Sequence, residues 1–212
     1  MARPVLYVLA GVNGAGKSSI GGHLLRQDGF DWFNPDTFAR ELRAITGCTQ
    51  EDANAAAWHE SIRQLDEAVA NRTTHAFETT LGGTTVARKI REAARTHDVI
   101  VWFCGLSTPE QHLRRVAARV KAGGHDIPEA KIRERYPRAL HNLIALMPHL
   151  ASLRVYDNSA EVGPEEPVPD PGLVLEMTAG QLVLPKTDDA AALARTPDWA
   201  KPLVEAAIAR AR

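Results

Sequence analysis

Long hydrophobic runs, cysteines and net charge are all in short supply in this chain. No apolar stretch approaches the roughly 18–20 residues that a membrane-spanning helix needs. The 2 cysteines, Cys48 and Cys104, do not have the spacing of metal ligands, so we interpret them as free thiols in a reducing compartment. The apolar N-terminus enters a glycine-rich loop without a signal-type cleavage site, which indicates a buried strand. These absences favour a cytoplasmic protein that makes no membrane contact.

An excess of charge of either sign is also missing. The chain has 25 Lys and Arg against 26 Asp and Glu, for a formal net charge of −1. No overall field therefore draws it to nucleic acid or to a membrane, and any anion-binding site must be local. The chain has 212 residues, 44% of them hydrophobic, and no internal repeat. We therefore expect one domain that spans residues 1–212.

Short β-rich runs alternate with helical segments through most of the chain. Strands are predicted for residues 5–10, 30–33, 75–81, 98–106 and 153–157. Helices are predicted for residues 17–27, 35–47, 49–71, 84–96 and 109–122, and again from residue 128. This alternation predicts an α/β fold, in which a parallel sheet is covered by helices on both faces.

The C-terminal quarter of the sequence is less regular. Residues 161–172 form an acidic, proline-rich stretch that suits neither a helix nor a central strand. Two apolar runs around Ala179 and Gly180 predict a β-hairpin, and residues 197–212 predict an amphipathic helix. We therefore expect a small hairpin and a helix, within residues 173–212, to follow the parallel sheet.

Residues 11–18 read GVNGAGKS, which fits the phosphate-binding P-loop pattern at every position and lies between a predicted strand and a predicted helix. Glycines let backbone N–H groups approach phosphate oxygens, the lysine contacts the β- and γ-phosphates, and the following hydroxyl ligates Mg²⁺. The predicted nucleotide-binding residues are Gly11, Asn13, Gly14, Ala15, Gly16, Lys17, Ser18 and Ser19, with Ser18 as the metal ligand. The motif leaves open whether phosphate passes to water, to a small molecule or into mechanical work.

Two carboxylates lie where a doubly wound sheet opens its binding crevice, at the carboxyl ends of strands. Asp36 is the second residue of a predicted helix, where it either favours the helix dipole or accepts the proton of an acceptor hydroxyl. Glu78 ends a predicted strand, and a buried glutamate needs a partner such as a substrate hydroxyl, a Mg²⁺-bound water or an arginine. Thr80 is equally consistent with substrate binding and with strand packing.

Residues 110–138 concentrate positive charge, with 8 Lys or Arg against 4 Asp or Glu. A glycine pair interrupts the helical pattern, so we interpret the segment as a hinged lid that neutralises phosphate charge. Arg119 precedes the break, and Arg135 lies in the next helix. His125 either caps the hinge, binds phosphate when protonated, or does neither.

The other arginines of the lid fit a solvated helix face better. These are Arg114, Arg115, Arg133 and Arg138. Nucleic acid is the rival partner for so much positive charge. However, Tyr136 is the only aromatic residue interleaved with it, and the isoelectric point of the chain is near 6.7. A stacking platform with a basic groove is therefore disfavoured.

Five segments together resemble the zeta-toxin family, in particular its shorter P-loop kinases. They are GVNGAGKSS, NPDTF, FETTL, ARVKAGGHDIPEAKIRERYPRALHNL and VYDNS, in that order, and the resemblance covers roughly residues 5–159. The resemblance implies a P-loop kinase fold and an ATP-dependent phosphotransferase with an alcohol group as acceptor. The best-known members phosphorylate a sugar hydroxyl of UDP-N-acetylglucosamine. An antitoxin partner is expected if the gene lies in a toxin–antitoxin operon.

The resemblance also implies roles for individual residues. By position, Asp36 is similar to the catalytic base of the family, and Lys17 and Ser18 to its ATP and Mg²⁺ residues. Glu78 and Thr80 match the pair that contacts the sugar nucleotide. For the lid, Arg119 matches the first arginine, but His125 occupies the slot of the second, which leaves Arg135 as a substitute. Two alternatives stay open: a kinase for another small acceptor, such as an antibiotic, sugar or nucleotide, and a regulatory or nucleic-acid-linked ATPase.

Overall fold

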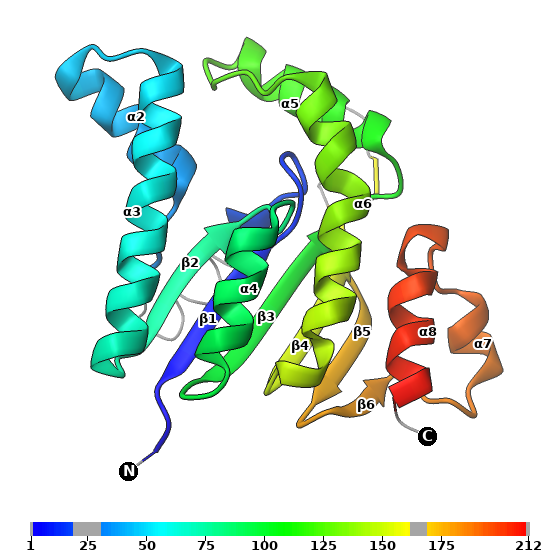
Figure 1. Cartoon of the computed structure of the whole chain (residues 1–212). Coiled ribbons are helices and arrows are strands. Elements are labelled where there is room, and N and C mark those ends of the chain that lie inside the picture. Colours follow the sequence, from blue (N-terminus) through cyan, green and yellow to red (C-terminus); the bar gives the residue numbers. More distant parts are fainter. Residues whose placement is uncertain (1, 19–30, 162–168, 211–212) are drawn as a thin grey trace.

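A six-stranded sheet forms the centre of the computed structural model, which describes residues 2–18, 31–161 and 169–210. The strands are β1 (Val5–Ala10), β2 (His75–Thr79), β3 (Asp98–Gly105), β4 (Ser152–Asp157), β5 (Gly172–Thr178) and β6 (Gln181–Leu184). Their order across the sheet is β2-β1-β3-β4-β5-β6 (Figure 1). The first four pair in parallel, and β5 and β6 pair antiparallel. The predicted α/β fold, with a mostly parallel sheet flanked by helices, is confirmed.

The predicted C-terminal hairpin is present and extends this sheet. β5 pairs with β4, and the chain then turns at Ala179 and Gly180, both with positive φ, into β6. A glycine in the left-handed region is the usual requirement of such a tight turn. The predicted terminal helix begins later than expected. A 3₁₀ turn over Asp198–Ala200 precedes α8 (Lys201–Arg210), after a short helix, α7 (Ala190–Ala194).

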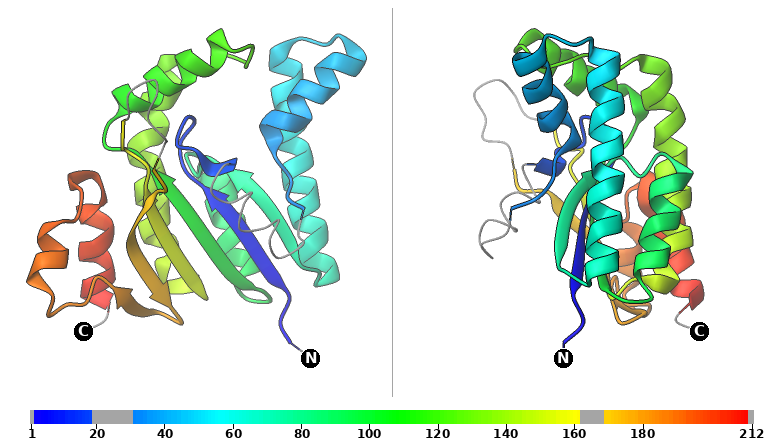
Figure 2. Two further views of the ribbon diagram at one scale, coloured as in Figure 1. Left: turned by 180° about the vertical axis from the view of Figure 1, so that it is seen from behind. Right: turned by 60° about the vertical axis from the view of Figure 1, so that its left-hand side comes forward.

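The main apolar cluster lies on one face of the sheet. Alternate residues of β1, namely Leu6, Val8 and Ala10, contribute to it, because side chains of a strand point to the same face every second residue. Three helices cover this face: α4 (Thr84–Ala93), α6 (Glu129–Leu146) and α8. Figure 2 shows the strands from behind, on the other face, where Leu9 and Ala76 form a smaller cluster. The helix predicted for residues 17–27 lies almost wholly outside the described residues.

Capping residues set the start of the helices around the site, as the sequence predicts. Asn34 opens α2 (Pro35–Thr46), and its Oδ1 accepts hydrogen bonds from the N–H groups of Asp36 and Thr37. Thr49 opens α3 (Gln50–Asn71) and exchanges hydrogen bonds with Asp52. Thr108 opens α5 (Pro109–Lys121). Each cap satisfies N–H groups that the first turn leaves unpaired, and so fixes where the helix begins.

The strand predicted for residues 30–33 is reduced to a single bridge among the described residues. Phe33 pairs with Phe77, its N–H donates to the Ala76 carbonyl, and its own carbonyl accepts from the Glu78 N–H. The pairing stops there because Asn34 already caps α2. This bridge matters for the site, since it holds the start of α2 beside the end of β2.

The parallel strands end at one edge of the sheet, and the glycine loop of residues 11–18 follows β1 at that edge. Both α2 and α5 lie beyond the carboxyl ends of the strands (Figure 1). The break predicted in the basic segment is present, because residues 122–128 separate α5 from α6. Within the described parts of the chain, no helix is long and apolar enough to span a membrane.

Candidate active site

The glycine loop is pressed against the neighbouring strands. Gly11, Gly14 and Gly16 have φ angles of 141°, 84° and 92°. A Cβ on Gly11 would lie 2.2 Å from the carbonyl oxygen of Cys104, and one on Gly16 would lie 2.5 Å from Nδ2 of Asn158. Only glycine fits here, because both the backbone angle and the space exclude a side chain. The loop therefore keeps the open backbone that phosphate binding requires.

Three buried or half-buried side chains hold the outer side of this loop. The Cys104 thiol and Asn158 Nδ2 both donate to the carbonyl of Ala15, at 2.8 and 2.9 Å. His112 Nδ1 donates to the carbonyl of Asn13 at 2.9 Å, which fixes the tautomer with the proton on Nδ1. Burial raises the pKa of Cys104 to about 12 and lowers the pKa of His112 to about 4. Both groups are therefore neutral hydrogen-bond donors at physiological pH.

Half of the predicted site residues line one cleft of about 400 Å³. They come from five separate segments, namely the glycine loop, α2, the end of β2, the loop between α5 and α6, and α6 itself, and α3 forms a further wall. The members predicted from the sequence are Asn13, Lys17, Asp36, Glu78, Thr80, His125 and Arg135. The sheet topology therefore brings the predicted nucleotide loop and the predicted acceptor residues together.

Asp36 lies half-exposed in the first turn of α2, between two groups of the basic segment. Arg119 Nη1 is 3.5 Å from Asp36 Oδ2, and His125 Nε2 is 3.9 Å from Asp36 Oδ1. Arg119 Nη2 donates to the carbonyl of His125, and among the described residues its buried Nε has no partner. Arg119 itself lines an adjoining cleft of about 420 Å³, which shares Asp36 and His125 with the first. The carboxylate thus sits at the junction of the two clefts.

Arg135 reaches the glycine loop from α6. Its Nη1 donates to Asn13 Oδ1 at 2.8 Å, and its stem packs so closely on Gly82 that a Cβ there would lie 2.5 Å from Arg135 Cγ. Burial lowers the pKa of Arg135, but a guanidinium keeps its charge in proteins. Arg119 therefore approaches Asp36 from α5, and Arg135 approaches the glycine loop from α6.

Glu78 is only 5% exposed, yet no arginine of the described residues forms an ion pair with it. Its Oε1 accepts from Trp32 Nε1 at 2.9 Å and from Asn34 Nδ2 at 3.0 Å. The same Asn34 Nδ2 lies 3.4 Å from Ser18 Oγ. The predicted need of Glu78 for a partner is thus met by two neutral donors. Thr80 lines the cleft beside it and accepts from the Gly82 N–H through its hydroxyl.

Asn34 is a site residue that sequence reasoning missed. Its position before Pro35 is fully explained by the helix cap, so nothing in the pattern pointed to the second end of its amide. Asn158 belongs to the VYDNS segment that resembles the zeta-toxin family. Nothing else in the sequence indicates its hydrogen bond to the glycine loop.

A divalent cation fits the residues at the loop. Within the described residues, no cluster of three or more His, Cys, Asp or Glu side chains could hold a metal alone. Mg²⁺ commonly takes only one or two protein ligands and fills the rest of its shell with water and phosphate oxygens. The Ser18 hydroxyl, beside Asn34, suits that arrangement. Ser19, also predicted to bind nucleotide, lies outside the described residues.

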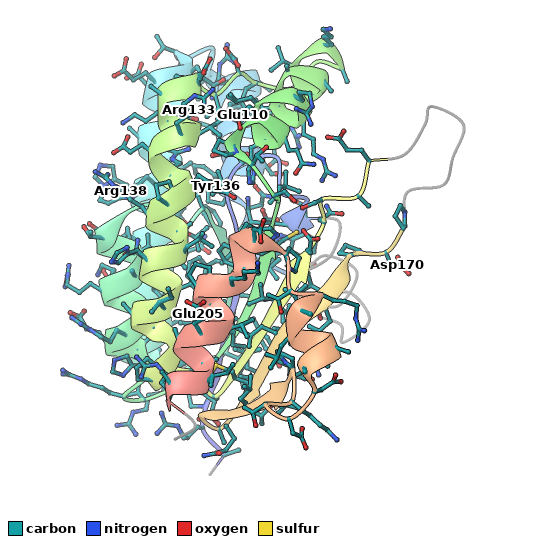
Figure 3. All side chains as sticks on the ribbon, turned by 90° about the vertical axis from the view of Figure 1, so that its right-hand side faces the viewer. Glu110, Arg133, Tyr136, Arg138, Asp170 and Glu205 are labelled. Atoms are coloured by element: carbon teal, nitrogen blue, oxygen red, sulfur yellow. The ribbon has the colours of Figure 1, made fainter. Side chains whose placement is uncertain are left out.

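The remaining arginines of the basic segment have different surroundings. Arg114 pairs with Glu161, and Arg133 pairs with Glu110 and Glu129; Figure 3 shows Arg133 and Glu110 together at one end of α6. These are exposed pairs, as a solvated face predicts. Arg115 differs from that expectation, because it donates to the carbonyls of Asn158 and Ala160. Arg138 is exposed and pairs with Glu134, and it also lines the cleft.

A family model described as an AAA domain matches residues 6–137, from β1 to the first half of α6. No curated protein matches the chain. The match covers the glycine loop, Asp36, Glu78 and the basic segment, and it stops before β4.

Several solved structures share the fold at low sequence identity. A chain of the AvrRxo1-ORF1:ORF2 complex with ATP matches 93% of this chain with a TM-score of 0.67 and 17% identity. This chain spans only 64% of the length of that one. A chain of the PezAT chromosomal toxin–antitoxin system of Streptococcus pneumoniae matches with a TM-score of 0.55 and 14% identity, over 74% of this chain and 68% of that one. A putative kinase from Chloroflexus aurantiacus gives a TM-score of 0.52 and 14% identity, over 63% and 78%. These similarities place the chain in the P-loop kinase type of fold.

Proposed function

The chain belongs to the AAA domain family, and from this premise we propose that it is an ATP-dependent kinase that phosphorylates a hydroxyl group of a small molecule. One observation carries the proposal: the carboxylate of Asp36 lies in the same cleft as Lys17 of the glycine loop, and its neighbours Arg119 and His125 come from the lid. A carboxylate beside a bound triphosphate can accept the proton of a substrate hydroxyl as phosphoryl transfer proceeds, which is the role of the catalytic-loop Asp in protein kinases.

The glycine loop would hold the triphosphate, with the Lys17 ammonium on the β- and γ-phosphates and the Ser18 hydroxyl on Mg²⁺. When bound, the metal ion supplies charge neutralisation between the phosphate oxygens. Asp36 accepts the proton of the acceptor hydroxyl while the oxygen of that hydroxyl forms a bond to the γ-phosphorus. The bond from that phosphorus to the β–γ bridging oxygen breaks, and ADP leaves with the electron pair.

The two lid arginines are suited to the charge that develops in this step. Arg119 has a buried Nε without a partner in the described chain, and its Nη1 is 3.5 Å from Asp36, so the contact is loose. Arg135 already bonds the side chain of a glycine-loop residue, Asn13. Movement of either guanidinium onto the γ-phosphoryl group would free Asp36 or Asn13 and stabilise the transition state electrostatically.

UDP-N-acetylglucosamine is the leading acceptor, on the strength of the sequence resemblance to zeta toxins. The other acceptors named above, an antibiotic, a sugar or a nucleotide, remain alternatives on the same framework. A protein antitoxin as partner and a cytoplasmic location stay predictions, as does the single domain over residues 1–212.

The test is to incubate the protein with γ-labelled ATP, Mg²⁺ and a metabolite pool, and to identify the labelled product. We expect a phosphorylated hydroxyl compound, with UDP-N-acetylglucosamine as the first pure acceptor to try. Asp36→Asn keeps the shape of the side chain and should lower transfer by at least about 100-fold while ATP still binds. Glu41→Gln, at an exposed position on the same helix, is the control and should leave transfer unchanged. ATP consumption without a labelled acceptor would instead support an ATPase.

A further inference from the structure

Three arginines line the cleft of about 420 Å³ that adjoins the first cleft at Asp36, and we call it the arginine cleft. Arg40 and Arg43 come from α2, and Arg119 comes from the last turn of α5. Among the described residues that line this cleft, Asp36 is the only carboxylate. A guanidinium keeps its charge in proteins, so positive charge is in excess here even with His125 neutral. The proposed transfer step uses only Arg119 and leaves the two arginines of α2 unexplained.

The two arginines of α2 continue the helix face that begins with Asp36. Asp36, Arg40 and Arg43 follow one another at spacings of four and three residues, which places them on one face of a helix. Arg40 has the spacing of a helical ion pair with Asp36, yet that carboxylate lies near Arg119 and His125 instead. Arg43 Nη1 donates to a neutral group, the amide oxygen of Gln50, at 2.8 Å. Within the described residues, neither arginine of α2 has a carboxylate partner.

Four other exposed helix arginines have different surroundings. Arg63, Arg88, Arg133 and Arg138 each pair with a glutamate three or four residues away on the same helix. Such pairs are typical of a solvated helix face. Two guanidiniums that lack them, and that share a cleft with a third, indicate a site for a ligand that brings its own negative charge.

The glycine pair after α5 allows Arg119 to reach this cleft. A Cβ on Gly124 would lie 2.7 Å from Arg119 Cγ and 3.0 Å from the Arg119 carbonyl oxygen, so the stem of Arg119 packs directly on the glycine backbone. The Nε of Arg119 is buried and has no hydrogen-bond partner among the described residues. A buried N–H without an acceptor costs free energy. Because guanidiniums bind oxyanions through parallel N–H groups, this unpaired N–H favours an oxyanion ligand.

We infer that Arg40, Arg43 and Arg119 form a second anion-binding site, separate from the glycine loop, that receives the phosphoryl group of the product. This inference rests on the proposed function, in which transfer leaves a phosphoryl dianion on the oxygen beside Asp36. Once Asp36 has released its proton to water, the carboxylate and the new phosphoryl group repel each other. The arginine cleft begins at the same carboxylate, so its three guanidiniums bind the phosphoryl group as it leaves Asp36.

The first test measures binding without turnover. Inorganic phosphate and a phosphate monoester, glycerol 2-phosphate, are titrated calorimetrically into protein whose glycine loop is filled with Mg²⁺ and a non-hydrolysable ATP analogue. Arg40→Gln with Arg43→Gln should weaken binding of both probes by about tenfold or more and reduce its dependence on salt. Arg91→Gln with Arg95→Gln is the matched control, because it removes the same charge from two exposed arginines outside the arginine cleft. It should change binding by less than about twofold.

The second test uses turnover. With the isolated product as inhibitor, Arg40→Gln with Arg43→Gln should raise the inhibition constant by about tenfold or more. The rate of a single turnover should stay within about twofold, because neither arginine lines the first cleft.

Each outcome separates the anion site from the kinase. Equal binding of both probes to wild type and to the α2 double variant, or an equal loss in the control, would overturn the inference and leave the kinase standing. Failure of both probes to bind would do the same. Binding of inorganic phosphate without the monoester would overturn the assignment to the product, because a phosphoryl group on an organic molecule would not fit. Arginine-dependent binding of both probes without any phosphoryl transfer would support the anion site and refute the kinase.

Discussion

Asn34 has two roles, because the oxygen and the nitrogen of its side-chain amide bind different groups. Its Oδ1 caps α2, and its Nδ2 donates to Glu78 and lies near Ser18. A helix cap alone needs only an acceptor oxygen, for which asparagine, aspartate and serine are nearly equal. The amide nitrogen is what distinguishes asparagine here, because it faces a buried carboxylate.

Asn34 substitutions should therefore separate the two roles. Asn34→Ala loses the cap and the Glu78 contact, and we expect a cost of about 1 kcal/mol in the free energy of unfolding. Asn34→Asp keeps the cap but places a second carboxylate about 3 Å from Glu78, so one of the two should have a raised pKa in the folded state.

The sign of the pH dependence follows from that raised pKa. A carboxyl that holds its proton more tightly when folded stabilises the fold at low pH and loses that effect as the pH rises. Asn34→Asp should therefore be closest to wild type at about pH 4, near the ordinary carboxyl pKa, and clearly less stable at pH 8, by urea denaturation. Equal stability of Asn34→Asp and wild type at both pH values would contradict the assigned contact.

At the residue scale, the sequence predicts well where one chemical demand explains a position. The glycine loop is of this kind, since the positive φ angles and close approaches of Gly11 and Gly16 admit only glycine. The role of a residue that meets two chemical demands is harder to predict from the sequence. The helix cap already explains Asn34 in the sequence, although this residue also lines the cleft. A surface charge likewise explains Arg138, although it too lines the cleft.

Local signals set the elements that carry the site. Caps at Asn34, Thr49 and Thr108 start helices at the predicted positions, because a side-chain oxygen there satisfies the first-turn N–H groups. Of the strand predicted for residues 30–33, the described residues 31–33 form a single bridge, from Phe33 to Phe77, because Asn34 already caps the next helix. Pairing depends on a distant segment, β2, and local composition does not contain that information.

The lid element offers a comparison between two arginines of one helix. Arg135 bonds Asn13 of the glycine loop, whereas Arg133 is paired with Glu110 and Glu129 at the surface (Figure 3). We expect Arg135→Ala to lower kcat by about 100- to 1,000-fold, because a preorganised donor to the transferring phosphate is lost. Arg133→Ala should stay within about twofold, since exposed pairs contribute little.

Steady-state kinetics at saturating ATP, with thermal denaturation of each variant, would check this difference. His125→Ala belongs in the same series, because His125 is the rival for the second lid position. A larger loss of kcat in His125→Ala than in Arg135→Ala would assign that position to the histidine. Equal rates for Arg135→Ala and Arg133→Ala would remove Arg135 from the catalytic group.

At the scale of the whole molecule, the site is a product of topology. Asp36, Glu78 and Arg135 are far apart in the chain, and the parallel strand order brings them to one edge of the sheet. The alternation of strands and helices predicted this edge as the binding crevice. It could not predict which lid residue meets which loop residue, because those contacts depend on how α5 and α6 pack over the sheet.

The same packing gives the folded protein a specific response to acid. His112 is 1% exposed under the glycine loop, and burial lowers its pKa to about 4, against about 6.5 for an unfolded chain. Burial also lowers the pKa of His75. Below pH 6.5 these histidines are protonated in the unfolded chain but stay neutral in the folded chain. The folded state therefore loses stability as the pH falls.

The carboxylates affect the free energy of unfolding at lower pH values than the histidines do. Hydrogen bonds from Arg63 and Gln64 lower the pKa of Glu60 to about 2, and ion pairs lower the pKa values of Glu110 and Glu161. A depressed carboxyl pKa contributes stability that is lost only as the pH falls below about 4.5, towards the folded pKa. The interval from pH 7.5 to pH 5 therefore isolates the histidines.

Over that interval, His112 alone should cost the wild-type protein about 2 kcal/mol in the free energy of unfolding. His112→Asn keeps a donor near Nδ1 for the Asn13 carbonyl but does not titrate. We expect it to be less stable than wild type at pH 7.5, because the smaller side chain leaves a cavity, yet to lose clearly less stability on acidification to pH 5. Urea denaturation midpoints at several pH values would measure both. Parallel pH profiles for the two proteins would show that His112 does not remain neutral beneath the loop, and the anchoring of Asn13 through an uncharged imidazole would then be wrong.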